Sequence, residues 1–247
     1  MSELKSYRVW DAPTRWFHWI NAISVVALVV VGYLILKGRA LEVSRAGSLT
    51  LKTIHTWIGY VFAVNLLVRI VWAFVGNRYA QWRAFLPGGR GYLAALVSYS
   101  RAFFSGHPEQ YLGHNPLGRL SVTAMLVLIL VLAVSGLVLA GTDLFYPPVG
   151  HWIAHWVAAP GVDPGTLVPN APHMYDKAAV DNMRAFRRPF IVSHLYAYYA
   201  LLVVAGLHVA GVVITEVREG GNLISATFTG TKIISGIPAD EKQSSGG

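Results

Sequence analysis

Residues 190–215, FIVSHLYAYYALLVVAGLHVAGVVIT, decide the fold because they place two histidines in an apolar run without formal charge. His194 and His208 lie fourteen residues apart. At about 100° and about 1.5 Å per residue, a helix makes almost four full turns over that interval and rises roughly 21 Å. The spacing therefore predicts two imidazoles on one side of one helix, at depths near opposite faces of a bilayer whose apolar core is about 30 Å thick.

The composition is that of a membrane protein. Of 247 residues, 54% are hydrophobic and only 13% are charged, whereas soluble domains are about one quarter charged. The formal net charge is +8, but Lys and Arg gather at the ends of apolar segments, which indicates membrane topology and lipid headgroups and argues against nucleic-acid binding. The absence of cysteine excludes disulfides, thiolate metal sites, iron–sulfur clusters and covalently attached c-type haem.

Four apolar runs are long enough to cross a bilayer. They predict transmembrane helices over residues 16–36, 54–75, 120–140 and 190–215. Residues 92–104 are apolar on one face but too short to cross, and they indicate an interfacial helix. The predicted fold class is an all-α integral membrane protein. A four-helix domain over residues 1–225 precedes a polar tail over residues 226–247, whose Gly/Ser-rich end is expected to be disordered.

The distribution of Lys and Arg predicts the topology. The side that holds both termini carries more of these residues than the opposite side, which favours a multi-pass membrane protein with both termini in the cytoplasm. The connection over residues 141–189 then lies outside. It is long, rich in proline and aromatic residues, and is expected to fold back on the membrane surface or to meet a partner.

This topology sorts four histidines into two pairs. His18 begins the first span on the inner side, and His208 lies in the inner half of the fourth span. His55 begins the second span on the outer side, and His194 lies near the outer end of the fourth. A single histidine in an apolar span is often a helix–helix hydrogen-bonding residue. Four histidines in two depth-matched pairs favour metal ligands instead, because a buried imidazole is costly unless it is satisfied.

Haem b is the metal group that suits these pairs. Zinc needs three or four converging ligands, and neither pair has a nearby carboxylate or thiol. Haem supplies four ring nitrogens itself, and bis-histidine iron has no open position, which favours electron transfer. We therefore predict two haem b groups. Small residues in the spans either let the rings approach the helices or reflect ordinary close packing; they are Gly32, Gly59, Gly136 and Gly206.

Several further residues have two readings each. Three cationic residues are candidates to bind the haem propionates: Arg15, Arg69 and Lys52. Each is equally well explained as a residue that sets the topology or that extends its charge to the membrane surface. His151 and His155 are four residues apart and either share a metal or, as the neighbouring tryptophans favour, lie on an amphipathic interfacial helix. His114 either helps deliver a proton to a quinone or shapes the turn that enters the third span.

The sequence resembles the b-type cytochrome subunit of membrane-bound nickel–iron hydrogenases, within the bacterial cytochrome b561 group. The likeness covers nearly the whole chain. It rests on the fourteen-residue histidine pair and on five stretches: WDAPTRWFHWIN at 10–21, IHTWIGY at 54–60, RIVWAFVGNRY at 69–79, GHNPL at 113–117 and NLIS at 222–225.

The resemblance implies a four-helix di-haem cytochrome b that passes electrons between a periplasmic redox partner and the quinone pool of a respiratory chain. It is then the electron-transfer subunit of an oxidoreductase complex rather than an enzyme alone. The family's haem-ligand positions fall on His18, His55, His194 and His208. Residues 141–189 are longer than expected for that family, so the partner could be a hydrogenase, a periplasmic c-type cytochrome or another oxidoreductase.

Two other functions remain open from the sequence. One is a free-standing b561-type quinone oxidoreductase that takes electrons from a small diffusible donor. The other is a haem-free membrane scaffold or transporter, in which the histidines make polar contacts between helices.

Overall fold

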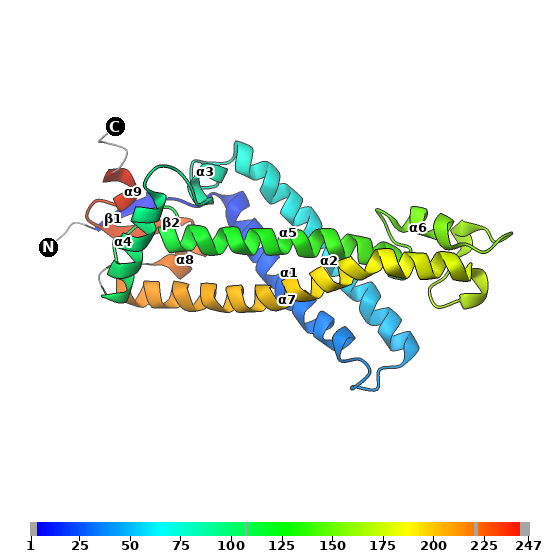
Figure 1. The fold of residues 1–247 in the computed structure, drawn as a ribbon. Coiled ribbons are helices and arrows are strands. Elements are labelled where there is room, and N and C mark those ends of the chain that lie inside the picture. Colours follow the sequence, from blue (N-terminus) through cyan, green and yellow to red (C-terminus); the bar gives the residue numbers. More distant parts are fainter. Residues whose placement is uncertain (1–3, 107, 220–221, 243–247) are drawn as a thin grey trace. The chain divides into compact units, whose positions relative to one another are not determined.

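The computed structural model describes residues 4–106, 108–219 and 222–242 (Figure 1). Within these residues, four helices are long and apolar enough to cross a membrane. They are α1 (Ala12–Leu36), α2 (Arg45–Val75), α5 (Pro116–Leu144) and α7 (Lys177–Glu219). The Gly/Ser-rich end over residues 243–247, for which disorder was expected, lies outside the described residues.

The long helices expose many apolar side chains along their lengths. Val64 and Leu67 on α2 are 62% and 61% exposed, and Val203 and Leu207 on α7 are 63% and 68% exposed. Exposed apolar area on this scale is unusual for a protein surrounded by water. It is expected where acyl chains cover the helices and every backbone polar group is satisfied inside the helix.

The long helices begin earlier than the apolar runs predict. The first turns of α2 are polar, and Ser44 caps them by accepting a hydrogen bond from the Gly47 backbone N–H at 3.0 Å. Helix α7 starts at Lys177 and continues through Pro189, although proline removes one backbone donor and usually ends a helix. A window that measures hydropathy therefore finds the apolar middle of each helix and misses its polar turns.

The chain divides into two compact units, and each long helix contributes a segment to both. Unit 1 contains residues 1–20, 65–127 and 201–247, and unit 2 contains residues 21–64 and 128–200. His18 and His208 consequently belong to unit 1, whereas His55 and His194 belong to unit 2.

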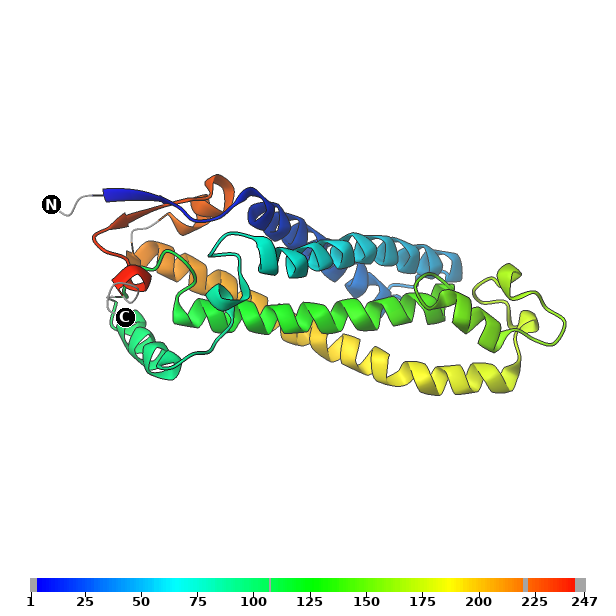
Figure 2. The same ribbon diagram turned by 90° about the horizontal axis from the view of Figure 1, so that it is seen from above.

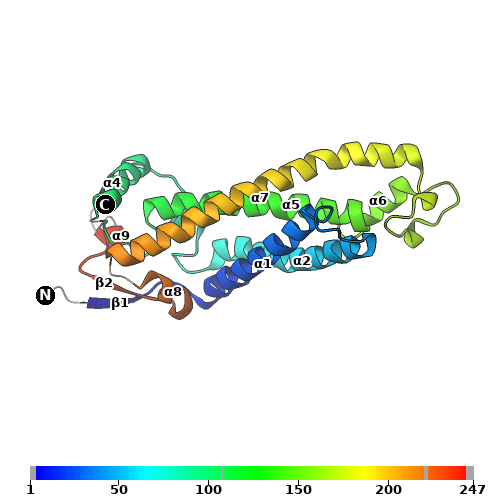
Figure 3. The ribbon, with the colours of Figure 1, turned by 90° about the horizontal axis from the view of Figure 1, so that it is seen from below.

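Unit 1 joins the two ends of the described chain in a small sheet. Strand β1 (Leu4–Arg8) pairs antiparallel with β2 (Thr231–Ser235), with Ser6 opposite Ile233 (Figure 2). Helix α8 (Leu223–Thr229) lies against the start of α1, where the Trp19 indole stacks on Phe228 at 4.3 Å (Figure 3). The remaining helices of this unit are α3 (Trp82–Phe85), α4 (Tyr92–Phe104) and α9 (Ala239–Lys242).

Two segments of unit 1 bear on the sequence predictions. Helix α4 occupies the residues for which an interfacial helix was predicted. The described part of the polar tail carries most of α8, all of β2 and α9, an arrangement that the sequence did not reveal. Asp240 in α9 accepts the backbone N–H groups of Leu112 and Gly113 at 3.0 and 2.8 Å, which ties this tail to the segment before α5.

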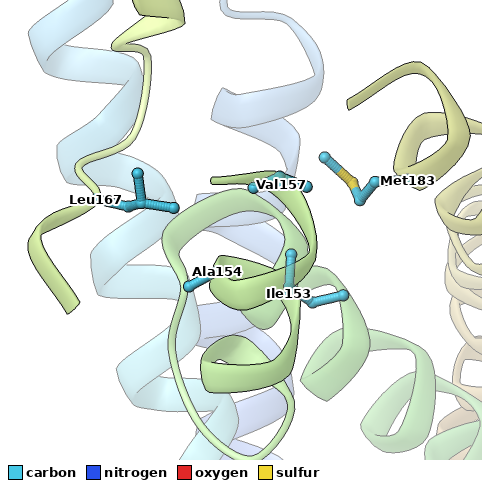
Figure 4. Packing of buried hydrophobic residues seen from close by; sticks show 5 residues of the cluster. All are labelled: Ile153, Ala154, Val157, Leu167 and Met183. Atoms are coloured by element: carbon cyan, nitrogen blue, oxygen red, sulfur yellow. The ribbon is translucent and has the colours of Figure 1, made fainter. Parts of the chain in front are cut away.

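In unit 2, the long connection after α5 folds around a core of its own. It contains α6 (Gly150–Val157) and two short 3-10 turns, η1 (Pro164–Thr166) and η2 (Pro172–Met174). Buried apolar side chains of α6, the following loop and α7 pack together (Figure 4); they are Ile153, Ala154, Val157, Leu167 and Met183. Only glycine fits at the start of α6, because a Cβ at Gly150 would lie 2.1 Å from the Phe145 carbonyl carbon.

Candidate functional site

Unit 2 brings together the first of the predicted histidine pairs. The imidazoles of His55 on α2 and His194 on α7 have their centroids 6.3 Å apart, with an interplanar angle of 66°. Two imidazoles bound on opposite sides of one metal, each through a metal–nitrogen bond of about 2 Å, have centroids roughly 6 Å apart. The spacing therefore fits one metal ion held between the two rings.

A serine on α5 orients His194. The Ser135 hydroxyl lies 2.9 Å from Nδ1 of His194 and 2.6 Å from the carbonyl oxygen of Val131. A hydroxyl has one proton, and the backbone carbonyl can only accept it, so Ser135 accepts the hydrogen bond from Nδ1–H of His194. This network leaves the Nε2 lone pair of His194 available to a metal, which is the usual arrangement of a ligating histidine.

Two glycines leave room beside these rings. A Cβ at Gly32 would approach Cε1 of His55 to 3.3 Å, and a Cβ at Gly136 would approach Cε1 of His194 to 3.4 Å. Nδ1 of His55 is buried and has no hydrogen-bond partner among the described residues. At Gly59 and Gly206, the other two glycines singled out in the sequence, an added Cβ would meet no described atom within 4 Å.

Unit 1 contains the second pair. His18 on α1 and His208 on α7 lie within electrostatic reach of each other, and the Ser121 hydroxyl lies 3.4 Å from Nδ1 of His208. Ser121 and Ser135 are fourteen residues apart on α5, as are His194 and His208 on α7. Each α7 histidine thus has a serine of α5 at its Nδ1. Neither serine stands out in the sequence as a histidine partner, although their fourteen-residue interval matches that of the histidines.

Cationic and aromatic side chains surround the pair in unit 1. Arg69 on α2 is only 8% exposed, and its guanidinium lies 4.6 Å from the ring centroid of Phe85 and 5.6 Å from that of Phe17. The His114 ring lies 5.0 Å from the Trp10 ring. Burial, together with the charges of Lys232, Arg69, His208 and Arg119, lowers the pKa of His114 to about 3. His114 is therefore neutral at physiological pH.

The other cationic candidates already have partners. Lys52 forms an ion pair with Asp143 at 2.8 Å, and Arg187 binds the second oxygen of that carboxylate. Arg15 donates a hydrogen bond to the backbone carbonyl of Phe228. The ion pair assigns Lys52 a structural role, whereas Nε of Arg15 is buried without a hydrogen-bond partner among the described residues. Arg69 has no carboxylate ion-pair partner among the described residues.

His151 and His155 lie on α6, as the amphipathic-helix reading expects. Their ring centroids are 4.4 Å apart and both side chains are exposed. Across the described part of the chain, no group of three or more His, Cys, Asp or Glu side chains converges on a metal position.

The comparisons with known proteins identify the family. The prokaryotic cytochrome b561 family matches residues 9–230. A probable Ni/Fe-hydrogenase B-type cytochrome subunit of Bradyrhizobium diazoefficiens is 27% identical over 91% of this chain and 85% of its own length. Similarly named proteins of Cupriavidus necator and Escherichia coli K12 are 35% and 33% identical.

The extent of the match differs among these relatives. The Cupriavidus match covers 48% of this chain and 52% of the relative, so the chain spans about half the length of that protein in the match. The Escherichia coli match covers 54% of this chain and 60% of the relative. The family match extends over most of the chain, including all four long helices. The chain therefore belongs to the prokaryotic cytochrome b561 family: it is a multi-pass, four-helix membrane cytochrome of the b type.

Proposed function

We propose that this chain is a di-haem cytochrome b that passes electrons between a redox protein on the outer face of the bacterial inner membrane and the quinone pool. The observation that best supports this proposal is the 6.3 Å separation of the His55 and His194 rings. This separation suits a single iron between them, and Ser135 leaves Nε2 of His194 available to it.

The four histidines bind and orient the two haem groups in this proposal. His55 and His194 hold the outer haem, and His18 and His208 hold the inner one. When bound, haem b would supply one-electron redox chemistry. Ser135 and Ser121 fix the tautomers of the two α7 ligands, and Gly32 and Gly136 keep the space beside the outer pair clear.

The proposed topology places both termini in the cytoplasm, and the assigned electron-transfer domain spans residues 1–225. Unit 2 then contains the outer pair together with α6 and the loops around it. Relatives of this chain are named as hydrogenase cytochrome subunits, so we propose a hydrogenase-like protein as the outer partner. The exposed side chains Trp152 and Trp156, 68% and 39% exposed, provide an aromatic surface for that contact.

Quinone reduction in this proposal takes place near the inner pair. The outer pair would hold the haem that exchanges electrons with the redox protein, and the inner pair would hold the haem that exchanges them with quinone, in either direction. The chain then acts as the membrane end of an oxidoreductase complex and not as an enzyme by itself.

Two measurements on the purified protein test this function. A reduced-minus-oxidised spectrum should show a b-type α band, and a pyridine haemochrome assay should give about two haems per chain. Anaerobic addition of a soluble quinol analogue should reduce the haem groups, and the oxidised quinone should reoxidise them. A protein that binds no haem, or whose haem exchanges no electrons with either quinone form, contradicts the proposal.

The partner has a separate test. Affinity purification of this chain from its native membranes should recover a stoichiometric redox protein, and exchanging Trp152 and Trp156 for Ser should weaken that association. Haem content should stay unchanged in this variant because α6 carries none of the proposed ligands.

A further inference from the structure

We infer that Arg69, Arg119 and His114 form a binding site for a carboxylate group beside His208. We infer further that this carboxylate is a propionate of the inner haem. That second step rests on the proposed function, in which His208 binds the inner haem.

Arg69 is a buried cation that forms no ion pair with any carboxylate of the described residues. Its side chain is 8% exposed, and Nη1 is buried without a hydrogen-bond partner among the described residues. Asp11 attracts this guanidinium electrostatically, but its carboxylate oxygens accept from Thr14, Trp72 and Asn77. Contacts with the Phe17 and Phe85 rings stabilise a cation in part, and they leave its charge uncompensated.

Arg119 and His114 contribute further unused donors. Arg119 donates from Nη2 to the carbonyl oxygen of Arg83 at 2.6 Å, while its Nε is buried and unpartnered within the described chain. Nδ1 of His114 is likewise buried without a described partner. By contrast, the ammonium of Lys232 donates to the carbonyl oxygens of Tyr111 and Gly113 at 3.1 and 3.2 Å.

Two of these donors are linked to the inner histidine pair through neighbouring residues. Arg69 lies over Phe17, the residue before His18. Arg119 lies two residues before Ser121 in the sequence, and the Ser121 hydroxyl is 3.4 Å from Nδ1 of His208. Arg69, Arg119 and His208 all act electrostatically on His114, so the three proposed donors and the ligand share one neighbourhood.

The chemistry of the donors selects a carboxylate. A buried charge is costly unless it is paired and hydrogen-bonded, and a guanidinium fits a carboxylate through two parallel hydrogen bonds. A quinone carbonyl is neutral and would leave both arginine charges uncompensated. A lipid phosphate approaches from outside, whereas Arg69 is almost fully enclosed by its own chain. Haem b carries two propionates and is proposed to bind at the adjacent histidines, which makes it the nearest source.

The test removes one charge at a time from the full-length protein. The variants are Arg69→Gln and Arg119→Gln, and the matched control is Arg90→Gln, an exposed arginine of the same unit. Spectroelectrochemical titration gives the midpoint potential of each haem, and transfer to excess apomyoglobin gives the rate of haem loss. His208→Ala identifies which titration step belongs to the inner haem.

We expect both Gln variants to lower the midpoint potential of the inner haem and to speed its loss. Ferrous haem carries one more negative charge than ferric haem, so removing a neighbouring cation disfavours the reduced form. The outer haem and the Arg90→Gln protein should behave as wild type. The charge-preserving variants Arg69→Lys and Arg119→Lys should keep the inner potential close to wild type while still speeding haem loss. If a Gln variant does not fold, the rate of haem loss from the corresponding Lys variant tests the inference instead.

Three results decide against the inference or against its basis. Wild-type potentials and haem-loss rates in both arginine variants overturn it. A loss of quinone reduction at unchanged potentials also overturns it, because the site would then receive quinone. If His208→Ala retains every haem, the proposed ligand set fails, which is a separate outcome from failure of the carboxylate site.

Discussion

The Ser135 hydroxyl on α5 bonds to Nδ1 of His194 on α7 at 2.9 Å and to the Val131 carbonyl oxygen at 2.6 Å, while only 2% of Ser135 is exposed. The backbone carbonyl fixes the hydroxyl, and the hydroxyl in turn fixes the imidazole. The equivalent contact in unit 1, between Ser121 and His208, is longer at 3.4 Å. The two α7 histidines are thus held by the same chemistry with different strength.

Ser135→Ala should therefore perturb the outer haem more than Ser121→Ala perturbs the inner one. Loss of the acceptor makes His194 a weaker electron donor and should raise the outer midpoint potential; loss of such a partner typically lowers metal-group affinity roughly 10- to 100-fold. Thr142→Val is the control, because among the described residues the Thr142 hydroxyl bonds to the Leu139 carbonyl on the same helix and to no histidine. Equal potentials in all three variants and wild type would show that the serine contact has no role at the ligand.

Gly32→Ala and Gly136→Ala should each displace a ligand ring. The added methyl group would lie 3.3 Å from Cε1 of His55 or 3.4 Å from Cε1 of His194, closer than normal van der Waals contact. We expect lower occupancy of the outer haem, measured as haem per chain after purification. Gly206→Ala, where the new methyl group meets no described atom within 4 Å, should retain both haems. Full occupancy in all three variants would contradict the close packing at these rings.

Asp11 should make the stability of unit 1 dependent on pH. Burial by itself would raise the pKa of Asp11, but hydrogen bonds from Thr14, Trp72 and Asn77 outweigh it and lower the pKa. A carboxylate whose pKa is lowered by folding contributes stability that is present above its unfolded pKa, about 3.9, and is lost as pH falls toward the folded value. The melting temperature in detergent should therefore fall below about pH 4.

The Asp11→Ala variant tests the source of this dependence. Removing the helix cap alone should cost about 1 kcal/mol, and loss of the Trp72 contact, which measures 3.0 Å, should add to that. The variant should melt lower than wild type at neutral pH and lose less stability on acidification. An unchanged acid dependence would assign it to other carboxylates.

The Asp143 carboxylate should stabilise unit 2 by holding two cations. It is 14% exposed and pairs with Lys52 at 2.8 Å and Arg187 at 2.5 Å. Asp143→Asn leaves two partly enclosed positive charges unpaired and should destabilise the protein by roughly 1–3 kcal/mol, between the ranges for surface and buried pairs. Asp181→Asn breaks an exposed ion pair with Arg184 and should cost less than about 0.5 kcal/mol. Denaturant titrations in detergent compare the two, and similar effects would remove the special role of Asp143.

The sequence predicts the four long helices and the positions of the four histidines because both depend on local periodicity. Hydropathy locates the apolar middle of each span, and a fourteen-residue interval on a helix fixes the shared face of His194 and His208. It misplaces the start of α7 because Lys177 and the next turns are polar and Pro189 resembles a boundary.

Contacts between distant segments lie beyond this kind of reasoning. The pairing of β1 with β2 joins residues more than two hundred positions apart, and short strands without a helix-like period give no warning of it. Arg119 looks like a topology residue in the sequence, and only its Nε burial marks it as a candidate ligand-binding group. The serine pair on α5 has the right spacing, but spacing alone does not say which face of α5 meets α7.

The most direct test of the central claim is haem content in single and double histidine variants, measured by the pyridine haemochrome assay. We predict about two haems per wild-type chain and about one in each of the four single His→Ala variants. The double variants His55→Ala/His194→Ala and His18→Ala/His208→Ala should also retain about one, whereas His55→Ala/His208→Ala should retain none. Unchanged haem content in the single variants, or equal losses in every double variant, would contradict the assignment of two separate bis-histidine sites.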